Sequence, residues 1–171
     1  TSGLSAIALA AYTVGRTSTP SVADEAARVA RLDPTPFGRR NAELSLGWLA
    51  AAAGSTQDCE QQLTIIDGLP GEIGILGLSG LSVGHGRGVL LARLGRLDEA
   101  IAEIEDALPT LTSGAVVGYA WAAYDCARIR LQRDAPDDRE RARELIDEAL
   151  DHAQTLGMKP LIEKLLAIKL K

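Results

Sequence analysis

The chain has 171 residues, of which 46% are hydrophobic and only 4% aromatic, and its formal net charge is -5. This length can bury a core, but alanine, leucine, isoleucine and valine must fill it because large rings are scarce. The negative charge disfavours nucleic acid as a partner, since no predicted face is strongly basic. Small residues and scattered β-branched residues favour helices over a sheet, so the predicted fold class is all-α.

Membrane and secretion signals are absent from the sequence. No run approaches the roughly eighteen uninterrupted apolar residues of a spanning helix, and the N-terminus lacks the pattern of a signal peptide. Cys59 and Cys126 lie in apolar helical segments without metal-ligand spacing, which is typical of core residues in a reducing compartment. We therefore expect a cytoplasmic protein without membrane contact. Because the chain starts on Thr1 rather than Met, we also expect it to be a piece of a longer protein.

Four apolar helical runs each end on a residue that favours a turn. These residues are Gly15, Gly54, Gly95 and Asp134, and their spacings are 39, 41 and 39 residues. After each turn, acidic or hydroxyl residues can cap a second helix, beginning near Ser21, Ser55, Leu97 and Asp137. Near-equal steps of helix, turn and helix predict a repeat architecture.

The predicted hairpins span 1–39, 40–80, 81–119 and 120–157, followed by a capping helix at 158–171, all in one domain. Small residues recur where helices should touch, at Gly47, Gly88 and Ala127 in first helices and at Cys59, Ala100 and Ala142 in second helices. In the capping helix, leucines should cover the last hairpin while lysines face water. We expect the apolar first run, which has no polar cap before it, to form a homodimer contact through the N-terminal end.

Several of these residues match one repeat family. Leu46-Gly47, Gly54, Gly95, Leu97-Asp98-Glu99-Ala100 and Ala107-Leu108 resemble the tetratricopeptide repeat, and the match is strongest within 88–108. The resemblance implies a right-handed α-solenoid of tetratricopeptide-like helical hairpins. The period of about 40 departs from the usual 34, so HEAT-like helix pairs stay open as an alternative.

The last third of the chain resembles a narrower group. Tyr124 to Arg128, 133–142 and 156–161 look like the C-terminal tail of large bacterial multidomain signalling ATPases. Such proteins combine an AAA/STAND-type NTPase with a cyclase-like or transcriptional-activator domain. The resemblance implies that this segment is a non-catalytic part of a signalling or transcription regulator. The arginines of 128–143 alternate with acidic residues, which predicts a solvated face with i,i+4 ion pairs.

Sites for chemistry are not apparent. The glycine-rich stretch 71–88 lacks the Gly-Lys-Ser/Thr ending of a phosphate loop and follows no predicted strand, so we interpret it as a connection into a small-residue helix. His85 and His152 have no carboxylate or cysteine partner at ligand spacing, and we expect them on the surface or in a groove. The sequence therefore predicts no catalytic residues, no cofactor and no metal.

The remaining candidate is a partner-binding groove. By resemblance to tetratricopeptide domains, the first helices line the concave side and present Trp48, His85, Arg93, Trp121, Tyr124 and Arg128. The alternative for each tryptophan is that it fills the gap between two helices. We expect a protein or peptide partner, including another domain of the parent chain. A small-molecule effector domain and a structural spacer are the alternative functions.

Overall fold

The computed structural model describes residues 8, 10–12, 24, 27–28, 31–32, 35–68, 75–76, 81–112 and 115–170. The chain divides into two compact units, Thr1–Glu72 and Ile73–Lys171, which are treated separately below. The described residues are predominantly α-helical, and this confirms the predicted all-α class. Most of the first predicted hairpin, including Gly15 and Ser21, lies outside the described residues.

In the first unit, α3 (Pro36–Ala53) and α4 (Thr56–Asp67) pack against each other. α3 begins at Thr35, whose hydroxyl accepts from the Gly38 N–H at 3.0 Å. α4 begins with a capping box, in which the Ser55 hydroxyl accepts from the Asp58 N–H and the Asp58 carboxylate accepts from the Ser55 N–H. The predicted turn at Gly54 and helix start at Ser55 are therefore confirmed.

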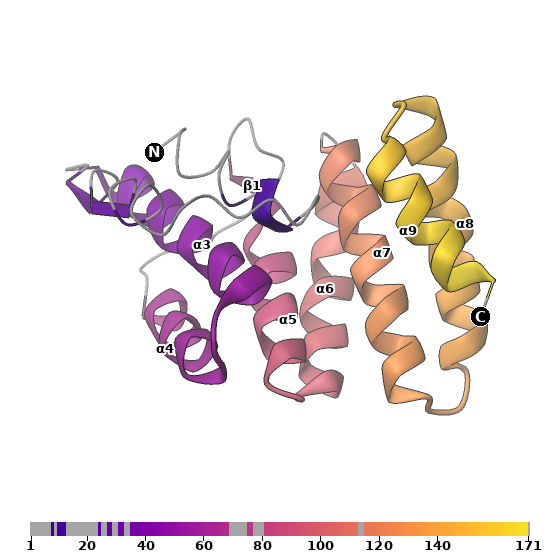
Figure 1. The fold of residues 1–171 in the computed structure, drawn as a ribbon, viewed down its shortest axis with the longest axis horizontal. Coiled ribbons are helices and arrows are strands. Elements are labelled where there is room, and N and C mark those ends of the chain that lie inside the picture. The colour runs from indigo at the N-terminus through magenta and orange to yellow at the C-terminus, as the bar shows by residue number, and fades with distance from the viewer. Residues whose placement is uncertain are drawn as a thin grey trace. The chain divides into compact units, whose positions relative to one another are not determined.

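The second unit contains five described helices after a short antiparallel ladder. They are α5 (Val83–Arg93), α6 (Leu97–Thr112), α7 (Val116–Arg133), α8 (Asp138–Thr155) and α9 (Lys159–Lys169), and the ladder pairs β1 (Ile75–Leu76) with β2 (Leu81–Ser82). Each helix packs on the next one along the chain, while α5 also touches α7 and α7 touches α9 (Figure 1). The first helices α5 and α7 and the last helix α9 thus touch in succession.

The predicted turns of the second unit are confirmed. Gly95 has a φ of +77°, and the Arg96 N–H donates to the Leu91 carbonyl at 3.0 Å, which closes the end of α5. Asp134 ends α7 in the left-handed conformation, with a φ of 53°. α5 begins earlier than its apolar run suggested, because the helix includes Gly84, Gly86 and Gly88 of the glycine-rich stretch.

Close contact with α6 explains why α5 tolerates so many glycines. A Cβ added at Gly88 would lie 2.4 Å from Ile104 Cγ1 and 2.8 Å from the Ala100 carbonyl oxygen. A Cβ at Gly84 would lie 2.8 Å from the Glu103 carbonyl oxygen. The low helix propensity of glycine is outweighed here by packing that a side chain would prevent.

α9 begins close to the predicted start of the capping helix. Two of its own side chains, Leu161 and Leu165, are fully buried. Its opposite side differs from the polar surface that was expected. Leu166 and Leu170 are exposed, and the Lys169 ammonium is drawn sideways to Asp147 of α8 at 2.6 Å. α9 therefore carries apolar residues on both sides.

We predict that Gly88→Ala destabilises the chain although alanine favours a helix. Overpacking costs about 1–3 kcal/mol, more than the roughly 1 kcal/mol gained from helix propensity, because Ile104 is fully buried and cannot move aside. Urea denaturation followed by circular dichroism measures the net change. Gly68→Ala is the control, since its Cβ would meet only atoms at 3.6 Å or beyond. A stabilised Gly88→Ala protein would contradict the close packing of α5 on α6.

Candidate functional site

The residues predicted for the groove have different surroundings. In the first unit, Trp48 is only 2% exposed, and its ring meets that of Tyr12 edge to face with centroids 4.5 Å apart. In the second unit, Trp121 and His85 are buried, Tyr124 and Arg128 are partly buried, and Arg93 is exposed. The burial of both indole rings agrees with the alternative that each tryptophan fills the gap between two helices. Arg93, Tyr124 and Arg128 are the members that reach the surface.

His85 is the residue for which the sequence-based expectation was wrong. Its Nε2 lies 2.9 Å from Asp125 Oδ2, and the two side chains are 0% and 1% exposed. The histidine therefore has a carboxylate partner and lies in the interior between α5 and α7. Asp125 follows His85 by forty residues, so a search for local ligand spacing could not find it. Aligning the repeats would have found it, since one period of 39 residues places His85 opposite Tyr124, next to Asp125.

The second oxygen of Asp125 accepts a hydrogen bond from the partly exposed Arg128 at 3.3 Å. A buried carboxylate is costly unless it is paired, and here one partner comes from each of two helices. The Ser82 hydroxyl accepts from the His85 backbone N–H at 3.0 Å and so caps α5. The His85–Asp125 contact joins two hairpins, and the Ser82 hydrogen bond begins α5. These polar groups therefore have structural roles.

We predict strong coupling between His85 and Asp125. His85→Leu leaves the Asp125 carboxylate buried with less compensation, and Asp125→Leu leaves the imidazole in an apolar site. Each should lower the free energy of unfolding by about 3 kcal/mol at neutral pH. The double variant should lose less than the sum, by at least about 1 kcal/mol, in a double-mutant cycle measured by urea denaturation. Additive losses would contradict a direct pair.

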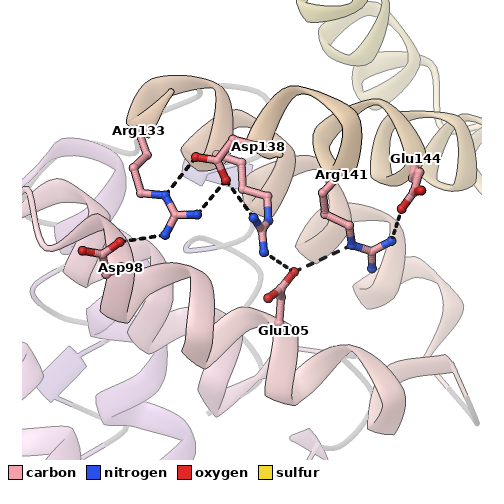
Figure 2. Close-up of polar contacts among 7 residues, drawn as sticks. Asp98, Glu105, Arg133, Asp138, Arg141 and Glu144 are labelled. Carbon is pink, nitrogen blue, oxygen red and sulfur yellow. Dashed lines mark hydrogen bonds and ion pairs between the residues drawn. The ribbon is translucent and has the colours of Figure 1, made fainter. Parts of the chain in front are cut away.

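A second polar cluster joins α6, α7 and α8 (Figure 2). Asp138, which is fully buried, accepts from Arg133 at 2.6 and 2.9 Å, from Arg130 at 2.7 Å and from the Ala135 N–H at 2.9 Å. Arg133 also contacts Asp98 of α6 at 2.6 Å. Arg130 donates to Glu105 of α6 at 2.7 Å. We call these five side chains, Asp98, Glu105, Arg130, Arg133 and Asp138, the ionic network.

A further arginine extends the network along α8. Arg141 lies 3.8 Å from Glu105 and donates to Glu144 at 2.7 Å (Figure 2). The sequence predicted ion pairs four residues apart on a solvated face, and for these arginines the prediction is wrong. Arg130 and Arg133 instead bridge three helices, because α6 presents carboxylates toward them, and the local pairs of Arg139 and Arg141 span five and three residues.

The buried carboxylate of the network belongs to Asp138, the first residue of α8 after the α7–α8 turn. Asp137 was expected to cap α8, but it adopts a left-handed conformation with a φ of 68° and makes no side-chain cap. The carboxylate of the neighbouring Asp138 accepts a hydrogen bond from the backbone N–H of Ala135 in the turn. The hydrogen bond from Arg133 lowers the pKa of the Asp138 carboxyl well below its ordinary value of 3.8, and the Ala135 and Arg130 bonds lower it further.

Two other titratable groups near these helices, the Cys126 thiol and the Tyr119 phenol, are stabilised in their neutral forms. Burial raises the pKa of the Cys126 thiol to about 12, so this cysteine is a core residue, as predicted, and a poor nucleophile. Burial and the hydrogen bond that Tyr119 donates to Glu148 raise the pKa of Tyr119 to about 12. The His152 ring meets Tyr119 edge to face, with centroids 5.2 Å apart.

Chemistry that depends on clustered ligands has no candidate in the described part of the chain. Among those residues, no group of three or more histidine, cysteine, aspartate or glutamate side chains could hold a metal ion. None of the described helices combines the length and the apolar character needed to cross a bilayer. The chain matches no family model, no curated protein and no solved structure.

We predict that Asp138→Asn lowers the free energy of unfolding by about 3 kcal/mol at neutral pH, because two arginines lose their shared anion. The folded pKa of Asp138 is lowered, so its stabilisation is complete above pH 3.8 and is lost as the pH falls further. The free energies of unfolding of the unsubstituted chain and of Asp138→Asn should therefore become more similar as the pH falls below 3.8.

Asp98→Asn is the matched control for this prediction. Its side chain also binds Arg133 but is 86% exposed, so its removal should cost less than about 1 kcal/mol. Denaturant titrations over a pH series measure both variants. Equal losses in the two variants would show that burial of Asp138 does not decide its contribution.

Proposed function

We propose that this chain is a non-catalytic interaction module built from tetratricopeptide-like hairpins. In this proposal the hairpins form a right-handed α-solenoid that belongs to the C-terminal part of a bacterial multidomain signalling or transcription regulator in the cytoplasm. Its partner is a protein or peptide, including another domain of the parent chain.

The observation that carries the proposal is that the same pairing of two consecutive helices occurs twice within Ile73–Lys171. α5–α6 and α7–α8 are consecutive helix pairs whose turns, at Gly95 and Asp134, are 39 residues apart. α5 and α7 touch each other as first helices of neighbouring repeats would. The residues with special electrostatics, His85, Asp125 and the ionic network, are committed to joining these helices.

The proposed binding face comprises Arg93 of α5 with Tyr124 and Arg128 of α7. We retain these three because they reach the surface, whereas Trp121 and His85 are buried. Tyrosine and arginine are the side chains that most often contribute strongly to protein interfaces. Trp48 belongs to the first unit, and we propose a packing role for it because of its burial.

We predict that a photo-crosslinking residue at position 93 or 124 captures one defined partner in cells that express the parent protein. The same residue at position 143 should not, because Arg143 is also an exposed arginine but lies on α8, outside the proposed face. Mass spectrometry identifies the captured protein. Arg93→Glu should then weaken its binding about tenfold, equivalent to 1.4 kcal/mol, while Arg143→Glu should not.

Thermal unfolding must be unchanged in both charge variants, so that lost binding reports on the surface alone. Capture from position 143 as strong as from positions 93 and 124 would contradict the proposed face. No defined partner at any of the three positions would contradict the proposed function.

A further inference from the structure

We draw no further inference here: the strongest candidate, the exposed apolar side of α9 formed by Leu166, Ala167 and Leu170, carries none, because nothing in the structure shows what covers it.

Discussion

The buried carboxylate of Asp138 is the constraint on which the second unit depends. Because it is removed from water, it requires cations close by, and Arg130 and Arg133 supply them from the preceding helix. Both arginines extend onward to carboxylates of α6. One buried charge thereby fixes how three successive helices lie against one another. The turn between α7 and α8 adopts two left-handed residues to bring it there.

The His85–Asp125 pair holds α7 against α5. It joins the first helices of two consecutive hairpins, whereas the ionic network joins second helices to the first helix between them. α7 is therefore held by buried charges toward both α5 and α8. Apolar packing through small residues brings the helices close, and these directional contacts select one register among those that packing alone would allow.

The polar residues in the interior of the second unit make structural contacts. The hydroxyl of Ser82 caps α5, the carboxylate of Asp125 pairs with His85, and the thiol of Cys126 is buried with a raised pKa. Our functional proposal accordingly rests on exposed and partly exposed residues, namely Arg93, Tyr124 and Arg128.

The sequence by itself determined the helical class, the turns at Gly54, Gly95 and Asp134, and the small residues that meet at Gly88 and Ala100, because these depend on local propensity and on periodicity. It did not determine which charges meet. His85 and Asp125 are forty residues apart in the sequence. Arg133 binds Asp98 and Asp138, although other carboxylates are nearer to it in the sequence. The length of α5 also escaped local rules, since its glycines are favoured only by α6 packing on them. Only the tertiary structure could decide these contacts, because burial and distance set the strength of an ion pair, and neither is a property of local sequence.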